Sequence, residues 1–373
     1  MTTVSTTMGR SAASGRDDQL RRFLLGMAAL VAVAVIVGGG TRLTESGLSI
    51  TEWNVVSGIL PPLDVTVWLD EFEKYRRTVQ YRDLNQGMTL DDFKVIYLWE
   101  WSHRMIGRVI GATYLAGFAW FWWRGTYDRR APLFGQLLGV GLLIALQGAI
   151  GWWMVYSGLF DRVNVAPYRL AIHLTLACVI FACLIWLAQS RQVLAQSRQA
   201  LARSREVLAH RGAGTSWHAR GPLLIVAVIF LQIFLGALVA GNRAGYVFQT
   251  WPTMDGVLIP STLFEITPLW RNMFENAALV QFLHRLAAYA LLAIALANVV
   301  IWQRGHSGAR GGASLLFVLV CAQAGLGIAT LLTGMNLLVA LGHQAGMLVV
   351  LIAALRHAHD CLRPQALAAT PSA

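Results

Sequence analysis

The chain has 373 residues, of which 56% are hydrophobic and only 13% charged, and its mean hydropathy is +0.54. A soluble domain needs a more charged surface, so this composition excludes an ordinary soluble protein. The net charge of +11 would suit a nucleic-acid-binding protein, but the basic residues occupy short stretches between long apolar runs, and no nucleic-acid motif is present. We therefore expect a protein of the lipid bilayer that binds no nucleic acid.

Eight apolar runs are long enough to cross a bilayer as helices. They lie near 23–41, 104–123, 133–155, 169–188, 221–241, 281–302, 313–334 and 336–356. The first run has no small-residue cleavage site, which indicates a retained helix and not a signal peptide. The sequence thus predicts an all-α membrane protein with eight transmembrane helices.

The basic residues predict the orientation of these helices. The two tails and the loops near 124–132, 189–220 and 303–312 together hold 17 Arg and 5 acids, whereas the other side holds 13 Lys or Arg and 14 acids. Cytoplasmic loops carry the excess of basic residues. We expect both termini on the cytoplasmic side of a bacterial inner membrane.

The long segment 42–102 is predicted to be ordered on the outer side. Trp68, Phe72, Tyr75 and Val79 recur at helical spacing, which is typical of an amphipathic helix resting on the membrane. Thr89 followed by Asp92 predicts a capping box, and a helix beginning there could run without interruption into the second span.

The two halves of the chain resemble each other. GGGTRL at the end of span one corresponds to VAGNRA at the end of span five, and spans three, five and seven each carry Gln four residues before Gly. Corresponding single residues are Trp53 and Trp251, His103 and His284, Arg104 and Arg285, and His173 and His343. Corresponding elements are four helices apart, so the halves share one topology about an axis along the membrane normal.

We therefore expect two pseudo-symmetric four-helix bundles. The predicted organisation is a cytoplasmic tail 1–22, an N-terminal bundle 23–188 with the long outer loop, a basic cytoplasmic linker 189–220, a C-terminal bundle 221–356 and a cytoplasmic tail 357–373.

Four of the nine histidines are candidate ligands. His103, His173, His284 and His343 lie near the outer ends of spans two, four, six and eight, and ionisable groups inside spans are usually functional. The remaining histidines, on the cytoplasmic side, are expected to be solvated surface residues: His210, His218, His306, His357 and His359.

Heme suits these histidines better than zinc, because no carboxylate or thiolate set completes a tetrahedral site in both halves. Facing helices of a bundle can each offer one imidazole to an iron between them. Small residues follow the histidines at helical spacing and leave room for a flat macrocycle: Gly107, Gly111, Ala177 and Ala288. Arg104 and Arg285 are candidate partners for the heme propionates. All four histidines lie at one depth, so hemes near the outer face are expected and an electron path across the bilayer is disfavoured.

Several motifs together resemble the heme A synthase family across roughly 21–357. They are GGGTRLTESGLSITEW (38–53), EWSHRMIGRVIG (100–111), AIH (171–173), FLHRLAAY (282–289) and LGHQAG (341–346). The resemblance implies conversion of heme O to heme A by oxidation of the porphyrin C8 methyl to a formyl group. It also implies that His103 and His173 hold the substrate heme, and that His284 and His343 hold a resident heme b. The outer loops lack the cysteine pairs of some bacterial members, so this chain is more similar to the proteobacterial and mitochondrial branch.

Glu100 is the candidate catalytic residue. It precedes His103 by three residues and shares its helical face, whereas the second half carries Gln281 at the corresponding place. A carboxylate at the heme edge could accept a proton or stabilise positive charge at the methyl carbon. The alternative is a structural acid paired with Arg104 or Arg108.

Two other functions remain open. A non-catalytic cytochrome with two bis-histidine hemes would explain the four ligands, and a repeat-built transporter would explain the two halves but predicts helices broken at mid-membrane. The resemblance further implies heme O synthase and cytochrome oxidase assembly factors as partners.

Overall fold

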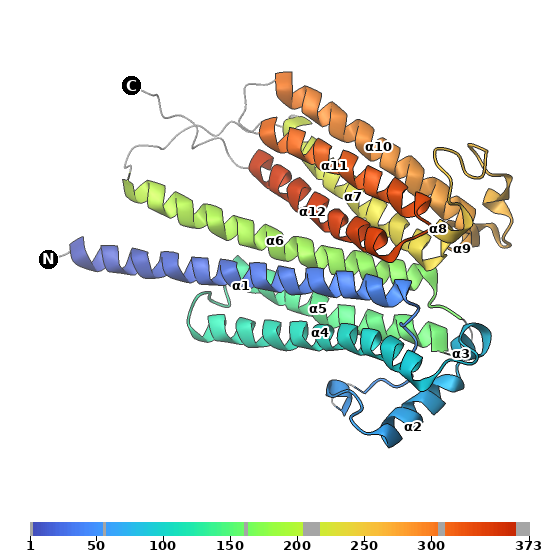
Figure 1. Cartoon of the computed structure of the whole chain (residues 1–373). Coiled ribbons are helices and arrows are strands. Elements are labelled where there is room, and N and C mark those ends of the chain that lie inside the picture. Colours follow the sequence, from blue (N-terminus) through green and yellow to red (C-terminus); the bar gives the residue numbers. More distant parts are fainter. Residues whose placement is uncertain (1–2, 55–56, 160–162, 204–216, 305–309, 363–373) are drawn as a thin grey trace.

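The computed structural model describes residues 3–54, 57–159, 163–203, 217–304 and 310–362, and nearly all of its regular structure is helical (Figure 1). Eight helices are long. They are α1 (Thr3–Leu43), α4 (Leu90–Trp123), α5 (Pro132–Leu159), α6 (Pro167–Arg203), α7 (Trp217–Gly241), α10 (Ala277–Arg304), α11 (Arg310–Leu332) and α12 (Leu337–Leu362). In the described ranges the only extended pairing is an isolated bridge between Met254 and Val257.

The long helices pack in two groups of four (Figure 1). In the first group α1 contacts α4 and α6, and α5 contacts α4 and α6; in the second, α7 contacts α10 and α12, and α11 contacts α10 and α12. The groups join where α6 meets α7 and where α12 meets α1 and α6. Fully buried Leu24, Leu184, Ile225 and Leu351 belong to one continuous core that crosses this junction. Because lipid tails are as apolar as these side chains, van der Waals packing, and not removal from water, holds the helices together.

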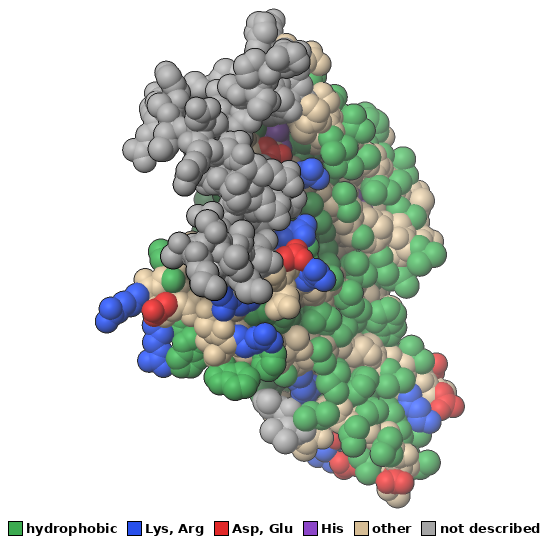
Figure 2. Space-filling view, turned by 90° about the vertical axis from the view of Figure 1, so that its left-hand side faces the viewer, with side chains coloured by type: hydrophobic (Ala, Val, Ile, Leu, Met, Phe, Trp, Pro, Cys, Tyr) green, Lys and Arg blue, Asp and Glu red, His purple; other side chains and the backbone are tan. Residues whose placement is uncertain are grey.

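Seven of these helices are long and apolar enough to cross a membrane. They are α1, α5, α6, α7, α10, α11 and α12. The predicted span 104–123 lies in α4. The most apolar stretch of this helix is less hydrophobic than those of the other seven, because it carries Arg104 and Arg108 and ends in a run rich in tryptophan. Seen from the end at which α1 begins, basic side chains gather around the helix ends and hydrophobic side chains cover the flank (Figure 2).

Helical structure extends beyond the predicted boundaries of the spans. Helix α1 includes most of the tail 1–22, and α6 and α7 enter the predicted linker 189–220 from its two ends. A tight turn joins the last two long helices, with Gly334 and Met335 both at φ 64°. Asn336 caps α12, its side-chain oxygen accepting the N–H of Leu338 at 3.1 Å.

Short helices make up the end of the molecule opposite the start of α1, which is the end that the topology predicts to be outer (Figure 1). They are η1 (Ser57–Ile59), α2 (Val65–Arg76), α3 (Val79–Leu84), α8 (Ala244–Val247), η2 (Ser261–Phe264), η3 (Leu269–Arg271) and α9 (Asn272–Glu275). The capping box predicted at Thr89 is confirmed: its hydroxyl accepts the N–H of Asp92, and the Asp92 carboxylate accepts the N–H of Thr89. Helix α4 then runs unbroken to Trp123, as predicted.

The aromatic face of α2 does not rest on a membrane. Trp68, Phe72 and Tyr75 pack against Phe93 and Tyr97 of α4, so the prediction that this face lies on lipid is wrong. The helix also ends at Arg76, and Val79 belongs to α3. Burial in this cluster raises the pKa of Tyr75 to about 12. The cluster fixes the outer segment to the top of α4, where the candidate site begins.

Candidate functional site

The four candidate histidines lie on four helices and form one pair in each helix group. His103 on α4 and His173 on α6 have ring centroids 6.4 Å apart, with their planes at 73°. His284 on α10 and His343 on α12 lie within electrostatic reach of each other. The structure therefore brings His103 near His173 and His284 near His343, as the family resemblance implies.

The spacing of the first pair fits a metal between two imidazoles. Nitrogen ligands at about 2 Å on either side of a metal separate the two ring centroids by about 6 Å. Among the described residues no group of three His, Cys, Asp or Glu could hold a metal ion. The spacing of the first pair thus suits a metal whose remaining ligands come from a macrocycle, as in heme.

A glycine from a neighbouring helix lies against each histidine ring. A Cβ added to Gly38 would lie 2.7 Å from His103 Cε1, and one added to Gly327 would lie 2.9 Å from His343 Cε1. The distances for Gly151 against His173 and for Gly236 against His284 are both 3.0 Å. Since real Cβ atoms do not approach so closely without strain, these glycines are the places where the rings are seated.

The glycine contacts also change the alignment of the two halves of the chain. They pair Gly38 on α1 with Gly236 on α7, each five residues before its helix ends. Aligning GGGTRL with VAGNRA instead pairs Gly40 with Gly241, about one helical turn away. With Gly38 and Gly236 as the reference, Trp53 and Trp251 each follow at the same distance of 15 residues.

Glutamines hold three of the four histidines. Gln147, Gln232 and Gln323 each lie four residues before the seating glycine, so they face the same histidine one turn further along the helix. Their side-chain amides donate to the backbone carbonyls of His173 at 3.0 Å, His284 at 3.1 Å and His343 at 2.8 Å. The same amide nitrogens lie 3.1–3.3 Å from a ring nitrogen of the histidine. The sequence showed the Gln–Gly spacing without its purpose, because the partner histidine is on another helix.

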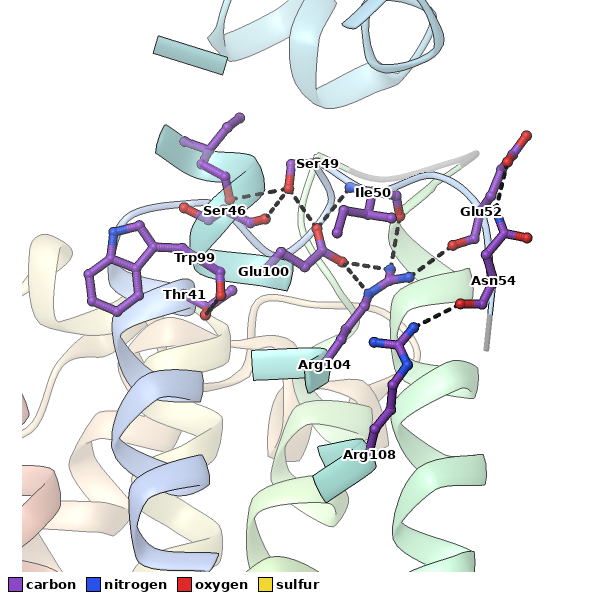
Figure 3. A network of polar contacts seen from close by, with 11 residues as sticks. Thr41, Ser46, Ser49, Ile50, Glu52, Asn54, Trp99, Glu100, Arg104 and Arg108 are labelled. Carbon is purple, nitrogen blue, oxygen red and sulfur yellow. Dashed lines mark hydrogen bonds and ion pairs between the residues drawn. The ribbon is translucent and has the colours of Figure 1, made fainter. Parts of the chain in front are cut away.

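Glu100 lies at the centre of a buried polar network at the outer end of α4 (Figure 3). Its carboxylate is 3% exposed and accepts two hydrogen bonds at each oxygen. Oε2 accepts the Ser49 hydroxyl at 2.8 Å and the Ile50 N–H at 2.9 Å. Oε1 accepts Arg104 Nη2 at 2.6 Å and Arg104 Nε at 3.1 Å. A buried carboxylate needs such partners, because an unpaired charge in a low-dielectric interior is costly.

Arg104 and Arg285 both hold outer loops. Arg104 donates to the carbonyls of Ile50 and Glu52, each at 2.9 Å, and its guanidinium lies 5.2 Å from the ring centre of Trp53. Arg285 donates to the carbonyls of Thr250 at 2.7 Å, Thr253 at 3.0 Å and Pro252 at 3.3 Å. Arg104, directly after His103, therefore holds the loop that carries Trp53, and Arg285, directly after His284, holds the loop that carries Trp251.

Gln281 also contacts the corresponding loop in the second half, but as a donor where Glu100 is an acceptor. Its amide donates to the carbonyl of Phe248 at 3.0 Å, and Phe248 precedes Trp251 by three residues, just as Ile50 precedes Trp53. Only the first half has an acid at this position. Glu100 and Gln281 thus share a loop-holding contact and differ in charge.

Gly107 and Gly111 follow His103 on α4 at one and two turns. A Cβ added to either glycine would meet no described atom within 4 Å. Ala177 and Ala288, predicted like the two glycines to leave room for a macrocycle, are half-buried.

Two histidines expected on the solvated surface are buried. His357 is 2% exposed, lies 3.1 Å from the Asn298 amide and packs against Trp302. His359 is 8% exposed and packs against Trp186 of α6. The prediction is wrong because α6, α10 and α12 continue together past the predicted edge of the bilayer. His210 and His306 lie outside the described residues, and the side chain of His218 is not described.

The chain matches known proteins along nearly its whole length. The profile of the family described as cytochrome oxidase assembly protein (COX15-CtaA) matches residues 21–355. A heme A synthase from Methylobacterium sp. is 50% identical over 352 residues, covering 93% of each chain. Heme A synthases from Methylorubrum populi and Azorhizobium caulinodans are 48% and 46% identical, over 93% and 96% of this chain and 88% and 99% of their own.

These matches and the apolar helices agree with each other. The matched range covers all or most of each of the seven helices that can cross a membrane, both histidine pairs and the Glu100 network. The chain therefore belongs to the cytochrome oxidase assembly protein family and is a multi-pass membrane protein.

Proposed function

We propose that this chain is a heme A synthase, an enzyme that oxidises the C8 methyl of heme O to the formyl group of heme A by two hydroxylations and loss of water. The observation that carries the proposal is a pair of histidines in each half, with an acid beside only one pair. Its support from relatives is 46–50% identity to proteins named heme A synthase over nearly the full chain.

The two pairs have different roles in this proposal. His103 and His173 bind the iron of heme O and later of heme A, whereas His284 and His343 bind a resident heme b. The resident heme supplies one-electron transfer when it is bound. The histidines set the position of the porphyrin. The seating glycines and the Gln amides set the position of the histidines.

Glu100 is proposed as the acidic group of the reaction. It lies one turn from His103, and the network of Ser49, Ile50 and Arg104 holds its carboxylate in one orientation. A fixed negative charge near the porphyrin edge would stabilise positive charge at the methyl carbon or accept its proton. The same bonds support the structural alternative, in which Glu100 serves only to pair with Arg104.

Arg104 and Arg285 hold the outer loops, and both are also proposed to bind the heme propionates. Arg285 Nε is buried and makes no hydrogen bond within the described residues, which leaves one donor for an anionic group. Both arginines lie near the outer ends of the predicted spans 104–123 and 281–302, where propionates of hemes near the outer face would lie.

For the membrane arrangement we propose eight spans, with α4 as the eighth, in two pseudo-symmetric bundles with both termini in the cytoplasm. The described parts of the long helices are continuous, and their interior Pro, Pro222, lies near the start of α7, so the broken helices of a transporter have no support. Reporter fusions at residues 80 and 200 should lie on opposite sides of the membrane; the same side for both would exclude this topology.

The proposal is tested by its product. Purified protein, or membranes from cells that make heme O, should convert heme O to heme A, detected by chromatography of extracted hemes. Two bound hemes without any heme A would favour the non-catalytic cytochrome, and a protein without heme would favour the transporter. Heme O synthase and oxidase assembly factors are the proposed partners on either side of this reaction.

A further inference from the structure

One turn of helix α1 lies against the ring of His103. A Cβ added to Gly38 would lie 2.7 Å from His103 Cε1, and the backbone carbonyl of Ala34, four residues earlier, faces the same ring. Residues four apart lie on one face of a helix, so Ala34 and Gly38 form a single contact surface. The position of this turn therefore sets the position of the His103 ring.

The second helix group holds the neighbouring face of the same turn. Gln344 of α12 donates its side-chain amide to the carbonyl of Val35 at 2.8 Å, and a Cβ added to Gly39 would overlap the side-chain oxygen of Gln344. Val35 and Gly39 directly follow the two residues that lie against His103. A carbonyl inside a helix has a second lone pair for such a bond, and a glycine lets the amide reach the backbone. The side chain of Gln344 is therefore fixed across the turn that seats His103.

Gln344 belongs to the helix that carries a histidine of the other pair. It directly follows His343, which is itself held from α11 by Gln323 and Gly327. The helix that carries this member of the C-terminal pair thus also holds the seat of a histidine of the N-terminal pair. A single residue links the two pairs.

The equivalent contact at the other edge of the junction is apolar. The repeat places Leu174 of α6 where Gln344 stands on α12, and Ala237 of α7 where Gly39 stands on α1. Leu174 packs against the apolar cluster that contains the buried Ala237. Because apolar packing joins the two groups at this edge, an amide is not required simply to join them.

We propose that Gln344 is a positioning residue for the N-terminal heme, through which the helix of His343 sets the place where His103 meets the iron. The inference rests on the proposed function and deepens it. A reaction that uses both hemes requires a fixed placement of one relative to the other. Gln344 meets this requirement because it connects the residue after one ligand with the seat of another.

Exchange of the amide for the side chain at the equivalent position tests this role. Gln344→Leu leaves no buried group unpaired, because the carbonyl of Val35 keeps its bond within α1. The protein is purified from cells that make heme O, and excess apomyoglobin is added to take up any heme that leaves. The hemes remaining on the protein are then extracted and separated by chromatography. Heme O and heme A are counted together, so the rate of loss does not depend on turnover.

Gln344→Leu should act on the heme of the other pair. Loss of heme O and heme A should become faster by about 10-fold, the lower end of the usual outer-shell effect, and the absorption band of this heme should shift. Loss of heme b should not change, although residue 344 is next to His343, because Gln323 and Gly327 still hold that histidine.

The same contact can be broken from the side of α1. In Gly39→Ala the added methyl group must displace the Gln344 amide, so heme O and heme A should again leave faster while heme b stays. In Gln344→Ala the space is vacant, and adding Gly39→Ala to that variant should have little further effect. Gly26→Ala is the control on α1, since nothing lies within 4 Å of its added Cβ.

Leu174→Ala is the matched control at the other edge of the junction, and heme b should leave at its normal rate in this variant. Unchanged loss of heme O and heme A in Gln344→Leu would overturn the inference alone. Equal acceleration for all the hemes in that variant, or faster loss of heme b in Leu174→Ala by the same factor, would do so too, because the effect would then be one of general packing. An unaltered protein that binds no heme O and no heme A would overturn the proposed function together with the inference.

Discussion

The N-terminal and C-terminal helix groups have the same arrangement of residues around their histidines, with differences at a few positions. In both, a glycine seats each histidine, an arginine after the first histidine holds the outer loop, and the residue three positions before that histidine contacts the same loop. The groups differ at that last position, which is Glu100 in one and Gln281 in the other, and at Ala34, which stands where the second group has Gln232. Only the first group thus has an acid three residues before its first histidine, and only there does a seating glycine lack a glutamine four residues before it. Under the proposed function, the acid at Glu100 is the difference that separates the half in which the reaction takes place from the half that holds heme b.

The charge difference predicts the largest effect. Glu100→Gln makes the first half resemble the second and should lower heme A formation by roughly 10²–10⁴-fold, the usual contribution of a general base. Heme b content should stay normal. The measurement is the yield of heme O, heme A and any hydroxylated intermediate, extracted from cells supplied with heme O.

A matched variant separates charge from structure. Ser49→Ala removes one of the four bonds to the Glu100 carboxylate and keeps the charge, so its heme A yield should remain near normal. Gln281→Glu should not create activity at the second pair. Wild-type heme A yield from Glu100→Gln would end the catalytic interpretation and leave the pairing with Arg104.

The sequence predicts those features of the two groups that depend on residues close together in the chain, and it predicts contacts between helices less well. The capping box at Thr89 and the unbroken α4 follow from spacing along one helix, and the correspondence of His103 with His284 and of His173 with His343 follows from the repeat. The partner of an apolar face does not: Trp68, Phe72 and Tyr75 predict a buried face, but only the fold shows that α4 and not lipid covers it.

The same limit explains the other errors. Hydropathy places the end of the last span near 356, so His357 appeared solvated, whereas the neighbouring helices extend as far as α12 does and bury it. The Gln–Gly spacing was visible in three spans, but its role depends on a contact between helices. The missing member, Ala34, has meaning only once Gly38 is known to seat His103.

The assignment of the pairs predicts the next effect. His284→Ala removes an axial ligand from the C-terminal pair and should reduce heme b retention by more than the 10- to 100-fold typical of outer-shell changes. His103→Ala should spare heme b and impair turnover, since it alters only the N-terminal pair. Heme content per protein and the reduced absorption spectrum measure both. Unchanged heme content in His284→Ala would show that this residue is not a ligand.

A smaller effect is expected from the seats. Gly236→Ala places a methyl group 3.0 Å from His284 Cε1 and must displace the ring, at a cost of about 1–3 kcal/mol for such overpacking. Heme b affinity should therefore fall roughly tenfold for each 1.4 kcal/mol. Gly151→Ala should act in the same way at His173 and spare heme b. Gly148→Ala is the control, because nothing lies within 4 Å of its added Cβ; equal heme loss in Gly148→Ala and Gly151→Ala would show that the contact with the ring is irrelevant.

The smallest effect concerns the junction between the two groups. Arg243 and Glu45 form an ion pair of 2.6 Å across the outer ends of α7 and α1, but their side chains are 37% and 25% exposed. Solvent screens such a pair, so Glu45→Gln should cost less than about 1 kcal/mol and lower the unfolding temperature in detergent by less than roughly 3 °C. The buried core shared by the two groups, and not this pair, should hold them together. Heme content and heme A yield should not change. A large loss of thermal stability in Glu45→Gln, with no such loss in the partly exposed control Glu52→Gln within the first group, would mean that the junction depends on charge and that the two groups are more weakly packed than their shared core indicates.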